Sequence, residues 1–412
     1  MTATGPGRGS SLLPLVEVRR AQPLHPDCPL SSLSLPDVQG RKIVFVITED
    51  WFFASHFLPM ARAARELGLH VAVVTRVRSH REAIEAAGAK VIPLEAERRS
   101  LNPMAAGYAA GQLAAILKAE KADLVHCIAL KGILVGGFAA ALAGIGRRVY
   151  ALTGSGFLGA RTDRVARLSQ RAVRLLVRGL ETGRTRYVFE NTDDPKLLGL
   201  DPTSERVTIL GGAGIDPDQF RPTPLPAQPP LKVAVVARML WSKGIDVAVE
   251  AVRQARAEGV AVELSLYGAP DPSNPKAIPE ETLKAWSAEP GISWHGATRD
   301  VAAVWRAHHV ACLPSRGGEG LPRTLLEAAA CGRAIVTTDV PGCRTLVRDG
   351  VEGRIVPTDD APGLAETLAA LSRRPDLVAR MGEAARARVL DGFTERDVIE
   401  SVKRLYRSML AS

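Results

Sequence analysis

The sequence predicts an α/β protein with two domains, each a parallel β-sheet covered by helices on both faces. Three observations support this prediction. Short apolar runs typical of buried parallel strands alternate with segments of helical spacing along most of the chain. The proline-rich stretch 221–230 divides this alternation into two series. A chain of 412 residues is also long enough for two or more domains with sizeable cores.

The elements follow in order along the chain. Residues 1–40 are rich in Pro, Ser and Gly, so we expect a mostly disordered extension, and they make a poor signal peptide. The predicted boundaries are a first Rossmann-like domain at 41–220, a linker at 221–231, a second Rossmann-like domain at 232–394 and a final helical segment at 395–412. Strands of the first domain are expected at Ile43–Ile47, Val71–Thr75, Leu124–Ile128, Val149–Leu152, Tyr187–Phe189 and Val207–Leu210.

Composition narrows the classes of protein. The net charge of +9 comes almost entirely from the residues before the linker. No basic motif is interleaved with aromatic residues, which argues against a nucleic-acid partner. The most apolar stretch, Gly132–Gly146, is too short to cross a bilayer. The five cysteines are scattered without metal-site or disulfide spacing, so we expect a cytoplasmic protein, soluble or peripheral on the inner face of the membrane.

Two cations lie in the first strand-to-helix loop of the second domain. Val233–Ala237 is a strand-like apolar run, and Ile245–Ala257 has helical spacing, so Arg238 and Lys243 lie in the loop between them. Ligands of parallel α/β sheets collect at the carboxyl ends of the strands, where helix N-termini bind phosphate. Two fixed cations at this place suit a diphosphate.

Two carboxylates flank another such junction. Pro322 suits the first position of a helix and Gly332 its end, so Glu319 lies in the loop and Glu327 within the helix. Carboxylates accept hydrogen bonds from sugar hydroxyls. Together with the two cations, they predict a site for a sugar nucleotide, although each charge alone is more often an ordinary exposed residue.

With these motifs the chain resembles the retaining glycosyltransferases of family four, which have the GT-B fold. The segments Val236–Ile245, Glu319–Gly332 and Thr338–Cys343 look like the donor domain of that family. Other segments are similar to a subgroup that extends glycans on polyprenyl-diphosphate carriers: Trp51–His56, His126 with Lys131, Thr153–Gly156 and Asn191–Asp194. The resemblance covers roughly Arg41 to Ser412.

The resemblance implies a function and roles for the site residues. A hexose or N-acetylhexosamine would pass from a nucleoside-diphosphate sugar, with uridine diphosphate favoured, to a lipid-linked or polysaccharide acceptor with retention of configuration. Arg238 and Lys243 would neutralise the leaving diphosphate in place of a metal, helped by N–H groups of Gly320 and Leu321. Glu327 would hold the ribose and Glu319 the donor sugar. No cofactor is expected.

Residues of the first domain are assigned to substrates. His126 ends a strand-like run and is expected to contact the donor sugar, with Lys131 near a phosphate, although a lone histidine there is more often part of a core. Asp50 and His56 flank an aromatic pair in the first strand-to-helix loop, where many relatives have a glycine-rich turn. They are expected on the acceptor side.

Five arginines form a seam on a predicted helix beside an apolar face of Val165, Leu168, Ala172, Leu175 and Leu176. Such a basic amphipathic helix suits an anionic lipid surface, but the same pattern fits a solvated helix that packs through its apolar side. The arginines are Arg164, Arg167, Arg171, Arg174 and Arg178.

Three alternatives stay open at the level of sequence. Asp216 and Asp218 spell the Asp-x-Asp of metal-dependent transferases, but Asp and Pro before the linker are ordinary turn residues. An epimerase or phosphorylase of the same fold is possible in principle, the latter only with a pyridoxal-binding lysine. A non-catalytic partner subunit would have lost the charged loops, all four residues of which are present.

Overall fold

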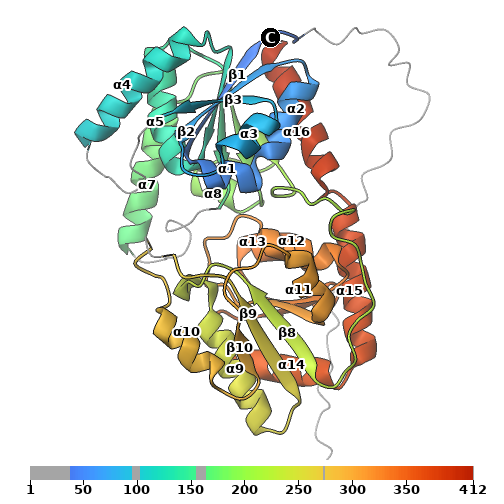
Figure 1. Ribbon diagram of the computed structural model, residues 1–412. Coiled ribbons are helices and arrows are strands. Elements are labelled where there is room, and N and C mark those ends of the chain that lie inside the picture. Colours follow the sequence, from blue (N-terminus) through green and yellow to red (C-terminus); the bar gives the residue numbers. More distant parts are fainter. Residues whose placement is uncertain (1–37, 95–102, 155–163, 272–273, 412) are drawn as a thin grey trace, which may run out of the picture. The chain divides into compact units, whose positions relative to one another are not determined.

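The structure is a computed structural model that describes residues 38–94, 103–154, 164–271 and 274–411. It confirms the predicted α/β class, with two parallel sheets and helices on both faces of each (Figure 1). The expected disordered extension, 1–40, lies outside the described residues except for its last three. So do Ser155 and Gly156 and the side chains of Arg164 and Val165.

The first domain contains a sheet of seven strands among the described residues, in the order β3-β2-β1-β4-β5-β6-β7. The order changes direction between β1 and β4, where ligands bind in open α/β sheets. The strands are β1 (Lys42–Glu49), β2 (His70–Arg76), β3 (Ala89–Pro93), β4 (Leu124–Ile128), β5 (Arg148–Leu152), β6 (Thr185–Phe189) and β7 (Val207–Ile209). The helices are α1 (Asp50–His56), α2 (Leu58–Glu66), α3 (Arg81–Ala86), α4 (Pro103–Ala119), α5 (Ala129–Leu142), α7 (Arg164–Gly179) and α8 (Asp194–Leu197).

The second domain repeats this plan, and its described residues form a sheet of six strands in the order β10-β9-β8-β11-β12-β13. The strands are β8 (Leu231–Val236), β9 (Val262–Tyr267), β10 (Ile292–Trp294), β11 (Val310–Leu313), β12 (Ala334–Thr338) and β13 (Gly353–Val356). The helices are η1 (Trp241–Lys243, a 3-10 turn), α9 (Ile245–Ala257), α10 (Glu280–Ser287), α11 (Val301–Ala307), α12 (Arg323–Ala330), α13 (Pro341–Leu346), α14 (Ala361–Ser372), α15 (Pro375–Leu390) and α16 (Glu395–Leu410).

Both faces of each sheet are buried, which explains why the strands read as continuous apolar runs. Side chains alternate along a strand, so Phe45 of β1 packs toward α2 while Val44 and Val46 pack toward α4 and α5. In β8, Val233 packs toward α9 and α14, and Ala234 packs toward α11 and α12. Each domain therefore has its own core, with one layer on either side of the sheet.

The last helix of the chain packs on the first domain. Val402 and Tyr406 of α16 are fully buried against the same face of the first sheet as α2. Arg62 of α2 forms two hydrogen bonds with Glu395, at 3.0 and 2.8 Å. A box of reciprocal hydrogen bonds between Thr394 and Asp397 begins α16, which explains its sharp start.

Helix α7 differs from one of the two interpretations of its sequence, that of a helix packed by its predicted apolar face. It packs through Val173 and Val177, and the predicted apolar face is exposed, with Leu168, Leu175 and Leu176 at 69%, 69% and 56%. The interpretation of a helix packed by that face is therefore wrong for these leucines. Within the described part of the chain, no helix has both the length and the apolar character needed to cross a bilayer.

Candidate active site

A cavity of about 750 Å³ opens at the carboxyl ends of both sheets. The first domain contributes residues that follow β1, β4, β5 and β6, and the second contributes residues from the loops after β8, β9 and β11, with Asn274, Pro275 and Lys276 in the loop after β9. The residues that line the cavity include Trp51, Phe52, His56, Ala129, Thr153, Gly154, Glu190, Arg238, Lys243 and the segment 317–324. The topology thus brings four of the predicted site residues into one cavity, Arg238, Lys243, Glu319 and His56.

Lys243 and Glu319 bind each other across this cavity. The Nζ of Lys243 lies 2.7 and 2.8 Å from the two carboxylate oxygens of Glu319, and the Ser315 hydroxyl donates to the same carboxylate at 2.6 Å. Gly244 sets the position of Lys243: its φ is +67°, and a Cβ there would lie 1.9 Å from the carbonyl oxygen of Pro314. Only glycine fits this turn without moving the backbone.

Arg238 is the more accessible cation of the predicted pair. It is half-exposed, its Nη1 lies 3.5 Å from a carboxylate oxygen of Asp271, and its guanidinium carbon lies 6.0 Å from the centre of the Trp51 ring. A guanidinium near an aromatic face is held by a weak cation–π attraction. Arg238 therefore keeps donor capacity toward an anion in the cavity.

Glu327 does not line the cavity. It is buried in α12, where Nε of Arg323 donates to its carboxylate at 3.0 Å. Burial raises the pKa of Glu327, and the neighbouring Arg323 opposes that shift. Arg323 does line the cavity and also donates to the carbonyl of Ser55 in the first domain. Arg323 was not predicted from the sequence, although its position four residues before Glu327 on one helix was a usable signal.

His56 lies where the sequence analysis expects it, on the cavity wall. The Ser55 hydroxyl is 2.6 Å from its Nδ1, and its ring packs on Phe52. Burial, together with the positive charges of Arg323, Lys243 and Arg238, lowers the pKa of His56 to about 4. The imidazole is therefore neutral near pH 7 and meets a ligand as a hydrogen-bonding group.

The other first-domain candidates lie away from the cavity. Asp50 is fully buried and accepts hydrogen bonds from the N–H groups of Arg78, Ser79 and His80, at 2.6 to 3.0 Å. Burial would raise the pKa of Asp50, but these N–H groups hold it below its usual value. Asp50 therefore orders the loop before α3, which corrects its expected place beside an acceptor.

His126 is a core residue. It is fully buried between Phe45 and Tyr406, and its Nδ1 lies 2.8 Å from the Tyr406 hydroxyl. Burial lowers its pKa to about 3. The expected contact with a donor sugar does not match this position. Lys131 sits half-buried on α5 and does not line the cavity either.

The possible metal motif is a turn. Asp216 accepts a hydrogen bond from the N–H of Asp218 at 2.9 Å, and Asp218 pairs with Arg221 at the surface. Neither carboxylate lines the cavity.

The sequence analysis also missed Glu190, which follows β6. Its Oε2 accepts a hydrogen bond of 2.8 Å from the N–H of Leu321, just before α12. Burial, together with the charges of Asp194 and Glu319, raises the pKa of Glu190 to about 7, and the hydrogen bond from the Leu321 N–H opposes this shift. Ala129 is a second unexpected feature, because its φ of +62° is rare for a residue with a side chain and it borders the cavity.

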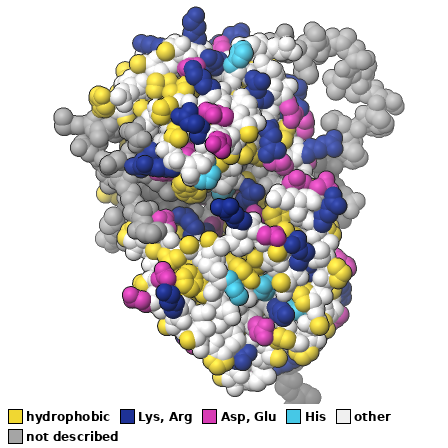
Figure 2. All heavy atoms as spheres, viewed as in Figure 1, with side chains coloured by type: hydrophobic (Ala, Val, Ile, Leu, Met, Phe, Trp, Pro, Cys, Tyr) yellow, Lys and Arg dark blue, Asp and Glu magenta, His cyan; other side chains and the backbone are white. Residues whose placement is uncertain are grey.

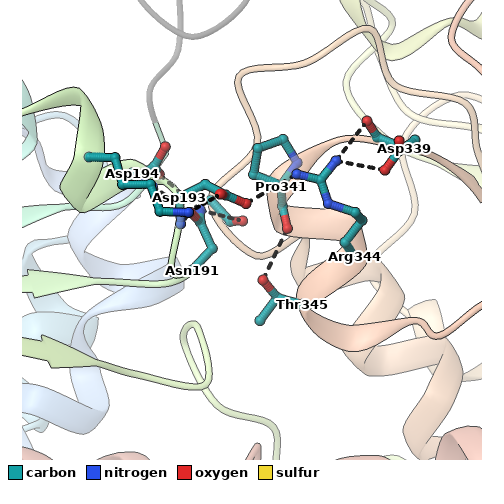
Figure 3. A network of polar contacts seen from close by, with 9 residues as sticks. Asn191, Asp193, Asp194, Asp339, Pro341, Arg344 and Thr345 are labelled. Carbon is teal, nitrogen blue, oxygen red and sulfur yellow. Dashed lines mark hydrogen bonds and ion pairs between the residues drawn. The ribbon is translucent and has the colours of Figure 1, made fainter. Parts of the chain in front are cut away.

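The loop after Glu190 joins the two domains (Figure 3). Asn191 accepts hydrogen bonds from the N–H groups of Asp193 and Asp194, which shapes the loop. Asp193 then pairs with Arg344 of α13 at 3.1 Å, and Arg344 also binds Asp339 at 2.6 Å. The segment Asn191–Asp194, quoted above for its resemblance, thus has a structural role.

Two protein-family models match the chain. Residues 42–182 match the family described as glycosyl transferase 4-like, and residues 230–374 match glycosyl transferases group 1. The N,N'-diacetylbacillosaminyl-diphospho-undecaprenol alpha-1,3-N-acetylgalactosaminyltransferase of Campylobacter jejuni is 25% identical over 366 residues, which is 85% of this chain and 94% of that protein. The putative colanic acid biosynthesis glycosyltransferase WcaL of Escherichia coli is 32% identical over 205 residues, 48% of this chain and 50% of that protein.

Solved structures share the fold. The Anabaena protein HepE in complex with UDP has a TM-score of 0.71 at 16% identity and covers 90% of this chain and 100% of its own. Sucrose-phosphate synthase from Thermosynechococcus elongatus has a TM-score of 0.71 at 18% identity, with 90% and 99% covered. The chain is therefore a glycosyltransferase with the GT-B fold, as its two motifs and its two facing sheets predict.

Proposed function

We propose that the protein transfers a hexose or N-acetylhexosamine from a uridine-diphosphate sugar to a lipid-linked or polysaccharide acceptor, with retention of configuration and without a metal. The observation that carries this proposal is the cavity with Arg238 and Lys243 at the carboxyl end of β8. Support for the substrates comes from the relatives, one of which acts on a diphospho-undecaprenol-linked sugar, and from the UDP complex of a protein with the same fold.

The cavity residues suit the leaving group. As the bond between the anomeric carbon and the phosphate oxygen breaks, negative charge develops on the β-phosphate, and Arg238 and Lys243 stabilise it. The acceptor hydroxyl forms the new bond to the anomeric carbon, and its proton passes to a leaving phosphate oxygen. Lys243 is held by Glu319 before the donor enters, so the donor diphosphate competes with that carboxylate for the ammonium group.

A binding experiment tests the donor site. Calorimetry with UDP, GDP and ADP, with and without EDTA, should show one diphosphate that binds equally well in both buffers. We expect Lys243→Ala and Arg238→Ala each to weaken that binding at least about tenfold, since each removes a charge-assisted contact. Lys284→Ala is a matched control, because Lys284 is exposed on α10, where it pairs with Glu280, and does not line the cavity.

Two results would contradict the proposal. If no diphosphate binds, the cavity is not a donor site, and a non-catalytic role becomes the better interpretation. If nucleotide is released or the sugar is altered without an acceptor, an epimerase fits better than a transferase. Retention itself is read from the anomeric coupling constant of the product by NMR.

We also propose that α7 contacts the membrane that carries the acceptor. Arg167, Arg171 and Arg178 are exposed along one side of the helix, next to the exposed leucines 168, 175 and 176. Arg174 does not join them, because its guanidinium donates to the carbonyl groups of Lys196 and Leu197. Leucines beside arginines suit the boundary of an anionic bilayer, where the apolar side chains insert and the cations meet headgroups.

Hydrophobic side chains also gather over α4 and α5 (Figure 2), where Tyr108, Phe138 and Leu142 are exposed. Co-sedimentation with phosphatidylglycerol vesicles tests the contact. Leu175→Glu should reduce binding several-fold while the thermal midpoint stays unchanged, because that side chain is exposed. Leu390→Glu, at an exposed leucine of α15, is the control. Equal binding by Leu175→Glu, or equal binding to phosphatidylcholine vesicles, would contradict the proposal.

A further inference from the structure

The carboxylate of Glu190 accepts a hydrogen bond from a backbone N–H group in the proposed donor site. Its Oε2 accepts from the N–H of Leu321 at 2.8 Å, two residues before α12 begins at Arg323. Helix α12 has its positive end here, and its free N–H groups favour an anion. In this structure the anion is a side chain of the enzyme itself.

The fit around this carboxylate is close. A Cβ on Gly320 would lie 2.0 Å from Oε2 of Glu190 and 2.9 Å from the carbonyl carbon of Thr153. A Cβ on Gly154 would lie 2.7 Å from the Gly320 nitrogen. The two glycines therefore let the backbones of the two domains meet, and Glu190 reaches the Leu321 N–H through the space that a side chain at 320 would fill.

The charged groups around Glu190 do not neutralise the negative charge of its carboxylate. The nearest charged groups that act on it are Asp194 of its own loop and Glu319 of the second domain, both acidic. Among the described residues that line the cavity, Lys243 pairs with Glu319, Arg323 with Glu327 and Arg238 with Asp271. The other titratable side chains of the cavity wall include Lys276 and the neutral His56. A buried carboxylate without a cation is unfavourable when ionised, so its pKa is raised to about 7.

We propose that Glu190 is an internal anion that takes the place of the donor diphosphate on the Leu321 N–H and must leave it when the donor binds. The residue then sets the donor affinity: its ionised carboxylate competes with the phosphate and repels it. The inference rests on the proposed function, since it assigns the same cavity to a nucleoside diphosphate. Glu190 belongs to the first domain, so the first domain opposes binding of the diphosphate to a site that is built mainly by the second domain.

Calorimetry with UDP and with inorganic pyrophosphate tests this role at pH 6 and pH 8. Glu190→Gln keeps the shape and removes the charge, so we expect it to bind UDP about tenfold more tightly than the wild type at pH 8. The ratio should fall toward one at pH 6, where the wild-type carboxyl is protonated. Glu205→Gln is the matched control, because Glu205 is an exposed glutamate of the same domain.

The outcomes separate the two proposals. If the wild type binds UDP and Glu190→Gln binds it equally or more weakly at pH 8, the role of Glu190 is wrong and the donor site stands. Glu190→Ala should show the same tightening as Glu190→Gln, and a tightening in only one of them would also overturn the competition. If neither wild type nor variants bind UDP or pyrophosphate, the proposed donor site itself fails. Tighter binding of both ligands by both variants supports an anion contact.

Discussion

Replacing Glu190 with Gln should change how the stability of the free protein depends on pH. The carboxyl of Glu190 ionises near its ordinary value of 4.5 when the chain is unfolded, and its pKa is about 7 in the folded protein. The folded state therefore holds a proton that the unfolded state has lost between these two values. The contribution of the Glu190 carboxyl to the free energy of unfolding is complete below about pH 4.5 and disappears as the pH rises through about 7.

The magnitude follows from the two pKa values. Between pH 5 and pH 8, the linkage relation gives a loss of about 2.5 kcal/mol in the free energy of unfolding from this one group. Glutamine at the same position does not ionise, so the variant lacks this part of the pH dependence. Its amide oxygen can still accept from the Leu321 N–H.

The assay is urea unfolding followed by circular dichroism at pH 5, 6, 7 and 8. The difference in free energy of unfolding between Glu190→Gln and the wild type should rise by about 2.5 kcal/mol, in favour of the variant, from pH 5 to pH 8. Glu205→Gln should run parallel to the wild type. Parallel curves for Glu190→Gln would refute the reasoning, because they would mean that Glu190 ionises alike in both states.

Two further predictions concern contacts that hold the site in place. Tyr406→Phe should lower the stability by about 1 to 2 kcal/mol, since it leaves the buried Nδ1 of His126 without a partner; the thermal midpoint should fall, whereas Tyr108→Phe, at an exposed tyrosine, should leave it unchanged. Gly244→Ala should lower the thermal midpoint and weaken UDP binding, because the new Cβ meets the carbonyl of Pro314 at a positive φ. Gly146→Ala, where a Cβ meets nothing within 4 Å, should do neither, and a normal midpoint for Gly244→Ala would show that the loop adapts.

Much of the fold could be predicted because its elements are encoded locally. The strand Leu124–Ile128 and the helix Ile245–Ala257 have the predicted bounds, since a buried parallel strand and an amphipathic helix each leave a periodic pattern. The strand Ala89–Pro93 escaped notice, because it has few large apolar residues and ends in a proline.

Residues of the site could be predicted only where a charged or polar residue comes soon after the carboxyl end of a predicted strand. Arg238, Lys243, Glu319 and His56 all reach the cavity, because the carboxyl ends of parallel strands share one edge. Glu190 could not be inferred in this way, since its role depends on its hydrogen bond with Leu321, a residue 131 positions away in the other domain. His126 has the same local signal as a site residue, and only the position of α16 shows that it is covered.

The return of α16 to the first domain has a consequence for how the chain is made. Ribosomes synthesise a protein from its N-terminus, yet one face of the first sheet is completed by α16, which is translated long after the strands of that sheet. Lys403 pairs with Glu66, a contact that spans 337 positions of sequence. Until the final helix emerges, the apolar surface that Val402 and Tyr406 cover must stay exposed or be shielded by a chaperone. A truncation of even the last turn or two would therefore impair the domain that was translated first.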